Sequence, residues 1–156
     1  MSRIHAAMQR ILLAAVVSLT VSACHGAPKD MPGDAGDRAP FHDISEHERI
    51  RVIGTEPFWN GEVANGRMTY TTPDEPQVKA FPVARFAGRG GLSFSGDAQG
   101  VPLVLAIAPG NCSDGMSDRA YPFTALLKIG EETRQGCAWT DARRPVERDS
   151  SSTESR

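Results

Sequence analysis

Residues 59–71 read WNGEVANGRMTYT, and this stretch decides the fold class. Asn65-Gly66 stands between two short runs, 59–63 and 68–71, in which apolar and polar residues are mixed. Asn and Gly tolerate the positive φ angles of a tight two-residue turn, so the pair predicts a β-hairpin. The prolines within 73–76 then end the second strand.

The same type of pattern continues on both sides of the hairpin. Further strand-like runs lie at 51–53, 78–86, 92–95, 101–108, 121–129 and 136–140, and Gly-rich turns separate several of them. No stretch keeps a helical period with capping residues at its ends. The spacing predicts an all-β domain over residues 49–140, a small antiparallel β-barrel or sandwich of about seven or eight short strands.

Residues 1–23 have the composition of a secretory signal. Arg3 and Arg10 precede the apolar run 11–21, and small residues stand before Cys24. The run is shorter than the ~20 residues that a lasting transmembrane span needs. A cysteine at this place resembles the bacterial lipobox, which implies that residues 1–23 are removed and that Cys24 carries acyl chains. The alternative is an uncleaved N-terminal anchor helix.

The residue after Cys24 and the charge of the mature chain bear on location and partners. His25 stands where an Asp would direct enteric lipoproteins to the inner membrane, so the resemblance implies an outer-membrane anchor and a periplasm-facing domain. Without residues 1–23, which hold two arginines and no acid, the chain has 15 basic and 19 acidic residues and a net charge of −4. This balance argues against nucleic acid and anionic lipid head groups as partners.

The other two cysteines, Cys112 and Cys137, are expected to form one disulfide, because the envelope is an oxidising compartment. The bond would close a loop of roughly 25 residues, worth about 3 kcal/mol on the chain-entropy model. A structural zinc site needs about four ligands at tight spacing, and the sequence does not supply them. We therefore expect no metal and no cofactor.

Two flanking segments differ in composition from the β domain. Residues 24–48 are rich in Pro, Gly, Asp and Ala, which predicts a flexible tether. A transition-metal site with His42 and His47 can be drawn near its end, but no rigid element would hold the ligands, so a solvated linker is the better interpretation. Residues 141–156 are charged and Ser-rich, which predicts a disordered tail.

Two motifs stand out from this β pattern. The first is GTEPFW at 54–59, and the second is CSDGMSDR at 112–119, which leads into YPF at 121–123 and precedes GCA at 136–138. With these motifs the chain resembles a family of bacterial envelope proteins, many of them predicted lipoproteins, that has no established activity. The resemblance covers residues 54–138 and implies a shared small β fold in the envelope, not a reaction.

Six residues of these motifs are candidates for a site, and they allow two interpretations. In a binding cleft, the two aromatic rings would stack on a sugar or peptide while the charged groups fix its polar atoms. In a structural clamp, Arg119 would make a bidentate bond to Glu56 and both aromatic rings would pack inside. The small size of the domain favours the clamp. The candidates are Glu56, Trp59, Asp114, Asp118, Arg119 and Tyr121.

Catalysis has less support from the sequence. Glu56 and Asp118 could form an acid–base pair acting on a glycan, and Ser113 and Ser117 could be nucleophiles. The expected folded part, 49–140, contains no histidine, so it cannot supply a Ser-His-Asp triad. We expect a non-enzymatic interaction module in envelope maintenance or stress tolerance, whose partner is an envelope protein or a cell-wall glycan. The alternatives are an inhibitor of an incoming hydrolase such as lysozyme and, with less support, a glycan hydrolase.

Overall fold

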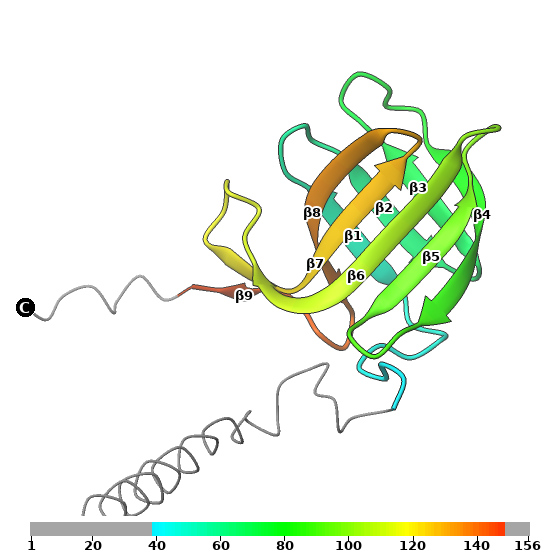
Figure 1. Cartoon of the computed structure of the whole chain (residues 1–156). Helices are drawn as coiled ribbons and strands as arrows, with labels where there is room; N and C mark the ends of the chain where they lie inside the picture. The colour runs from blue at the N-terminus through cyan, green and yellow to red at the C-terminus, as the bar shows by residue number, and fades with distance from the viewer. Residues whose placement is uncertain (1–38, 149–156) are drawn as a thin grey trace, which may run out of the picture. The chain divides into compact units, whose positions relative to one another are not determined.

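The computed structural model describes residues 39–148, which form a closed antiparallel β-barrel (Figure 1). The predicted signal segment, Cys24 and residues 149–156 lie outside the described residues. No helix in 39–148 is long and apolar enough to cross a membrane. The strands are β1 (Ile50–Gly54), β2 (Asn60–Ala64), β3 (Arg67–Thr71), β4 (Lys79–Ala87), β5 (Leu92–Asp97), β6 (Pro102–Cys112), β7 (Arg119–Ile129), β8 (Glu132–Thr140) and the short β9 (Val146–Glu147).

The barrel has a simple up-and-down order. Each of the strands β1 to β7 pairs antiparallel with the next one along the chain, and β8 pairs with β1 to close the ring. The predicted all-β class is confirmed, and the architecture is a barrel, not a sandwich. The predicted hairpin is also confirmed, because β2 and β3 pair Ala64 with Arg67 across Asn65 and Gly66, whose φ angles are 51° and 70°.

The eight predicted strand runs all correspond to strands, but β6, β7 and β8 are longer than predicted. β6 and β7 each have 11 residues and continue beyond the barrel wall as a curved two-stranded arm, coloured yellow in Figure 1. Their pairing shifts register between Pro109 and Cys112, which marks a bulge where the arm bends away. The two ends of the second motif, Cys112 and Arg119, therefore belong to the strands of the arm, and the loop between the strands is 113–118.

Side chains fill the inside of the barrel, as expected for a ring of about eight strands. Alternate residues of each strand point inward, and the pattern is clearest in β6, where Leu103, Leu105 and Ile107 are buried between exposed neighbours. The largest fully buried side chains are Trp59, Phe123, Ile44, Ile50, Met68, Leu103, Leu105, Ile107, Leu127 and Val52.

Trp59 sits in a niche that glycines make possible. A Cβ on Gly54 would lie 1.9 Å from Trp59 Cδ1, and a Cβ on Gly61 would lie 3.2 Å from Trp59 Cζ3. The indole Nε1–H donates to the carbonyl oxygen of Gln135 at 3.0 Å, so the polar atom of the buried ring is satisfied. Gly54 and Trp59, the two ends of the GTEPFW motif, thus belong to the packing of the core.

The folded region begins earlier than residue 49, which corrects the predicted end of the tether. Phe41 and Ile44 are buried in the core at one end of the barrel. The segment is held there by a hydrogen bond from Phe41 N–H to Gly88 O at 2.7 Å and one from Arg85 Nη2 to Ile44 O at 2.9 Å. The polar composition of residues 24–48 concealed two apolar side chains that close this end.

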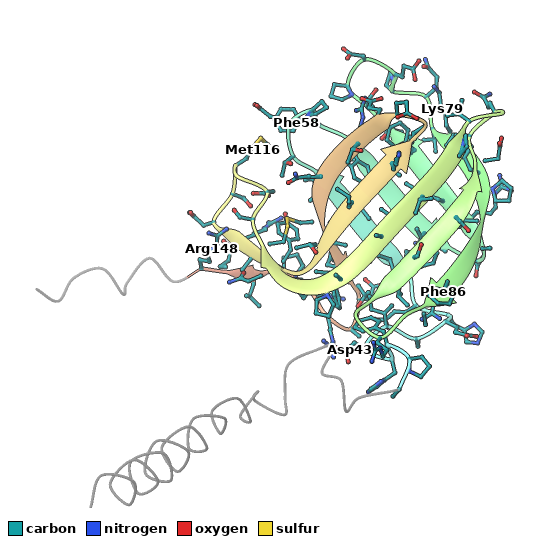
Figure 2. All side chains as sticks on the ribbon, viewed as in Figure 1. Asp43, Phe58, Lys79, Phe86, Met116 and Arg148 are labelled. Atoms are coloured by element: carbon teal, nitrogen blue, oxygen red, sulfur yellow. A yellow bond between two sulfur atoms is a disulfide. The ribbon has the colours of Figure 1, made fainter. Side chains whose placement is uncertain are left out.

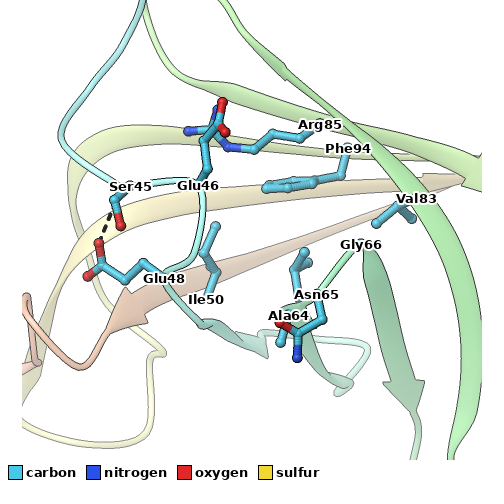
Figure 3. Close-up of a pocket in the computed structure, with 11 residues that line it drawn as sticks. Ser45, Glu46, Glu48, Ile50, Ala64, Asn65, Gly66, Val83, Arg85 and Phe94 are labelled. Atoms are coloured by element: carbon cyan, nitrogen blue, oxygen red, sulfur yellow. Dashed lines mark hydrogen bonds and ion pairs between the residues drawn. The ribbon is translucent and has the colours of Figure 1, made fainter.

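A small cavity remains beside this closing segment (Figure 3). It measures about 70 Å³, and Glu46, Glu48, Arg85 and Phe94 are among its lining residues. The Glu48 carboxylate accepts a hydrogen bond from Ser45 N–H through one oxygen, while the other oxygen is buried without a partner. The cavity is too small for more than a few water-sized groups, so this end of the barrel is effectively closed.

The folded region also continues beyond residue 140, which corrects the predicted start of the disordered tail. Asp141 accepts a hydrogen bond from Arg51 Nη1 at 2.7 Å, and Arg143 Nη1 donates to Asp43 at 2.9 Å. Val146 and Glu147 form β9, which pairs with the start of β7. Residues 141–148 therefore pack on the domain, although their composition is that of a solvated tail.

The Trp59 niche can be tested by adding a single methyl group. Gly54→Ala should lower the free energy of unfolding by about 3 kcal/mol, because the new Cβ overlaps the indole ring and a closed barrel gives it little room to move. Urea unfolding followed by tryptophan fluorescence measures the change. Gly90→Ala is the matched control, because a Cβ there has no heavy atom within 4 Å. Equal midpoints for the two variants would contradict the niche.

Candidate functional site

The structure distributes the six predicted site residues over three places. Trp59 lies in the core, and Glu56 lies exposed on the β1–β2 loop at one end of the barrel. The other four, Asp114, Asp118, Arg119 and Tyr121, belong to the arm formed by β6, β7 and their connecting loop. The six residues therefore do not form the single cleft that the first interpretation required.

The base of the arm packs against the outer face of β8. Cys137 and Trp139 alternate with the core residue Ala138, so they lie on the face of β8 turned away from the core. The predicted disulfide joins Cys112 of the arm to Cys137, with the two Cα atoms 5.5 Å apart. The ring of Tyr121 lies 5.5 Å from the ring of Trp139. The disulfide and this ring contact thus hold the arm against the barrel wall.

Asp114 organises the loop at the tip of the arm. Its carboxylate accepts hydrogen bonds from the backbone N–H groups of Met116 and Ser117 at 3.0 and 2.8 Å. It also accepts from the Ser117 hydroxyl at 2.7 Å and from the buried Tyr121 hydroxyl at 2.9 Å. Because these four donors surround a carboxylate that is only 7% exposed, Asp114 serves the loop itself and offers little to a ligand.

The environment of this carboxylate shifts two pKa values. Burial works to raise the pKa of Asp114, but the hydrogen bonds from Ser117, Met116 and Tyr121 outweigh it and hold the pKa far below its usual range. Burial raises the pKa of Tyr121, and the neighbouring Asp114 carboxylate raises it further. Both shifts favour a charged Asp114 carboxylate that accepts a hydrogen bond from a protonated Tyr121 hydroxyl.

Arg119 does not bond to Glu56, which corrects the predicted clamp. Its Nε–H donates to Glu147 Oε1 of β9 at 3.3 Å, and both side chains are more than half exposed. The backbone N–H of Arg148 donates to Asp118 O at 2.6 Å, which also ties β9 to the arm. The clamp interpretation was correct that Trp59 and Tyr121 are both buried, although Tyr121 is buried between the arm and β8 and not in the barrel core. The arm is fixed by its disulfide, by Asp114 and by β9.

The two motifs nevertheless meet at one short stretch of β8. The carbonyl of Gln135 accepts hydrogen bonds from Trp59 Nε1 at 3.0 Å and from Thr55 N–H at 3.1 Å. Two residues further along, Cys137 carries the disulfide to the arm. Gly136 lies between them, and a Cβ there would come within 2.6 Å of Ile53 O on β1. The GCA segment is thus the place where the first motif, the second motif and the barrel closure are joined.

The end of the barrel opposite the closing segment carries two adjoining hollows, which we together name the mouth. The first, of about 590 Å³, is lined by Glu56, Pro57, Phe58, Thr72, Pro73, Asp74 and Arg134. The second, of about 410 Å³, shares Thr72, Asp74 and Arg134 with the first, and Tyr70, Glu75, Lys79 and Glu132 are among its other lining residues. Figure 2 shows Phe58 and Lys79 at this end and Asp43 and Phe86 at the other. Volumes of this order are typical of small-ligand sites, which often occur in barrel mouths.

Arg134 is the central charged group of the mouth. It occupies an inward position of β8, two residues before Gly136, and only 16% of its side chain is exposed. Its guanidinium lies 5.9 Å from the ring centre of Tyr70, which in turn lies 5.9 Å from the ring of Trp59. A column of three side chains therefore runs from the core to the mouth.

The hydrogen bonds of Arg134 are incomplete. Nη2 donates to Glu132 Oε1 at 2.5 Å, whereas Nε is buried and has no hydrogen-bond partner. A guanidinium carries five N–H donors, so one exposed carboxylate cannot satisfy it. An arginine that served only to stabilise the fold would be expected to have more partners.

The rim of the mouth is acidic. Four carboxylates line it, against the two cations Lys79 and Arg134, and Lys79 is itself paired with Glu75. Two further acids lie at this end of the barrel, Asp97 at the end of β5 and Glu131 in the β7–β8 turn. The four carboxylates of the lining are Glu56, Asp74, Glu75 and Glu132. The mouth thus combines a partly buried guanidinium with a negatively charged rim.

Sequence reasoning identified Glu56 but missed the other polar residues of the mouth. Tyr70 and Asp74 lie outside both motifs, and Arg134 was hidden in a polar run before GCA. The strand period contained a signal for Arg134, because alternation from the buried Ala138 through Gly136 places it on the inward face. An arginine at an inward strand position is unusual and indicates a polar site at that position.

No known protein family, curated protein or solved structure matches this chain. Within residues 39–148, no group of three or more His, Cys, Asp or Glu residues has the geometry to hold a metal ion.

The role of Asp114 predicts a pH-dependent loss of stability on mutation. Asp114→Asn should lower the free energy of unfolding at pH 7 by about 2 kcal/mol, because charged hydrogen bonds are lost in a buried setting. The pKa of Asp114 is lower in the folded than in the unfolded state, so its contribution is complete at neutral pH. The contribution is lost as the pH falls from about 4, the pKa of Asp114 in the unfolded state, toward its lower pKa in the folded state.

Urea unfolding of both proteins between pH 7 and pH 2 measures this, and the difference between them should shrink on acidification. Asp118→Asn is the matched control, because Asp118 is an exposed acid on the same loop. A difference that stays constant over the whole pH range would contradict the role given to Asp114.

Proposed function

We propose that this protein is a lipid-anchored envelope protein whose barrel binds a positively charged partner at its mouth. One observation carries the proposal. The GTEPFW motif divides into a packed half, Gly54 and Trp59, and an exposed half, Glu56, Pro57 and Phe58, and the exposed half lines the mouth. Phe58 is 38% exposed, although it lies next to Trp59, the largest fully buried side chain. The exposed residues of the motif are therefore concentrated where a ligand would bind.

The geometry supports binding more than hydrolysis. Glu56 lines the mouth, whereas Asp118 lies on the arm, so the acid–base pair considered for a glycan hydrolase is not brought together there. Ser117 donates to Asp114, and Ser113 accepts from Gly115 N–H, so both hydroxyls serve their own loop. We accordingly retain the prediction of a non-enzymatic module.

The end of the barrel at which the chain enters also fits a tethered binding module. The described chain enters the barrel at the closed end, where Phe41 bonds to Gly88, and the mouth lies at the opposite end. The flexible tether predicted between Cys24 and this end would leave the mouth free to meet a partner in the periplasm, on an envelope protein or on the cell wall.

The acidic rim also favours the second candidate, an inhibitor of an incoming hydrolase. Such an inhibitor must present negative charge to a basic enzyme such as lysozyme, and complementary charge raises the rate and selectivity of that encounter. The two candidates differ in consequence: an inhibitor protects a cell-wall substrate from lysozyme, whereas a binding module for another partner does not.

A basic probe tests the mouth directly. Hexalysine binding to the soluble Cys24→Ala protein is measured by calorimetry at low and high salt. The double variant Glu56→Gln/Asp74→Asn should lose about tenfold in affinity, because two rim charges are removed, and binding should weaken as salt rises. Asp118→Asn is the control, since it removes a charge from the arm. Equal losses in the rim and arm variants would argue against the mouth, and protection of peptidoglycan from lysozyme would select the inhibitor.

The lipid anchor has a separate test. Cys24→Ala should move the protein from the membrane fraction to the soluble envelope fraction, because the acyl chains that hold it would be absent. Fractionation followed by immunoblotting measures the distribution. Ala23→Gly, which keeps a small residue before the cysteine, should leave the protein membrane-bound. A Cys24→Ala protein that remains in the membrane fraction would overturn the lipobox prediction.

A further inference from the structure

We propose that Arg134 receives a carboxylate of the ligand, so that the mouth selects a short peptide bearing both a basic group and a free carboxylate. This inference rests on the proposed function and adds the chemical class of the ligand. It follows from the unusual position of Arg134, which is a cation at the floor of a hollow whose rim is acidic.

The first step concerns what Arg134 can still bind. The guanidinium lies over the Tyr70 ring, which blocks movement toward the core, and its described hydrogen bond uses Nη2 alone. Glu132, the acceptor, is 55% exposed at the start of β8. A half-exposed carboxylate is a weak partner, so Arg134 keeps donor capacity directed toward the mouth.

The second step concerns the group that this capacity fits. A planar guanidinium with several donors matches a carboxylate better than it matches a hydroxyl or a single carbonyl. The partly buried position strengthens the preference, because charge-assisted hydrogen bonds are stronger in surroundings of lower effective dielectric. Arg134 is accordingly the place for the negative end of a ligand.

The third step concerns the rest of the ligand. Glu56 and Asp74 line the same hollow as Arg134, and no ion pair to a described residue is found for either carboxylate. They are therefore available to an ammonium or guanidinium group. Pro57, Phe58 and Pro73 add apolar surface between these charges. The arrangement fits a short peptide whose basic groups meet the rim and whose carboxylate meets Arg134.

The experiment compares two probes that differ in a single group. Trilysine with a free C-terminal carboxylate and trilysine with a C-terminal amide are titrated into the soluble Cys24→Ala protein. The amide carries one more net positive charge, so an acidic mouth without a carboxylate subsite binds the amide more tightly. A carboxylate subsite at Arg134 reverses this order, and we expect the free acid to bind at least tenfold more tightly.

Substitutions at Arg134 test whether this residue causes the preference for the free acid. Arg134→Gln should abolish the preference for the free acid, and Arg134→Lys should retain only part of it, because lysine keeps the charge but not the planar fork. Lys128→Gln, an exposed cation of β7 outside the mouth lining, should leave the preference unchanged. Thermal melts identify any variant that fails to fold, and the comparison of probes on the unaltered mouth does not depend on variants.

The outcomes separate this inference from the proposed function. Binding of both probes with a preference for the amide, lost in Glu56→Gln/Asp74→Asn, would overturn the carboxylate subsite and leave the binding module standing. The absence of binding by either probe would overturn both proposals. A preference for the free acid that persists in Arg134→Gln would place the carboxylate at another residue and overturn the role of Arg134.

Discussion

The structure depends on the closure of an eight-stranded ring at one short stretch of β8. At Gln135, a single carbonyl accepts hydrogen bonds from Thr55 and from the indole of Trp59. At Gly136, the absence of a side chain lets β1 and β8 approach. At Cys137, a covalent bond fastens the arm on the outside. The core, the ring and the arm thus share one attachment point, and closing the ring also removes the open strand edges that a sheet of this size would otherwise expose.

This attachment explains why the two motifs are dense in unusual residue types without forming one site. Trp59 is the largest side chain of the core, and it can be buried only where glycines make room and where a carbonyl accepts its N–H. Asp114 is buried in the arm, and it is tolerated because four donors surround its carboxylate. The polar groups of these two residues bond to other groups of the protein. The exposed motif residues Glu56 and Phe58 are therefore better candidates for contact with a ligand.

The disulfide followed from the cysteine count and the expected oxidising compartment. Strand periodicity and turn chemistry were sufficient to predict the all-β class and the hairpin at Asn65-Gly66, with barrel and sandwich both left open. They were insufficient at the boundaries, because composition averages over residues that act individually. Ile44 is one apolar residue among polar ones, yet it is fully buried at the closed end of the barrel. Val146 and Glu147 lie in a charged segment, yet they pair with β7 through backbone groups that the side chains do not reveal. The site was harder still to predict, because Tyr70, Asp74 and Arg134 are brought together only by ring closure.

The position of Arg134 connects the core to the proposed site. Its guanidinium stacks on Tyr70, and Tyr70 packs on Trp59, so the residue that fixes the core also fixes the floor of the mouth. A ligand group bound at Arg134 would therefore meet a pre-positioned cation and would pay little conformational entropy to order it. Glu56 and Asp74, by contrast, are exposed on the loops around it. A fixed cation beneath exposed carboxylates suits the recognition of one carboxylate within a variable basic sequence, because the carboxylate needs a defined geometry and the basic groups need only opposite charge.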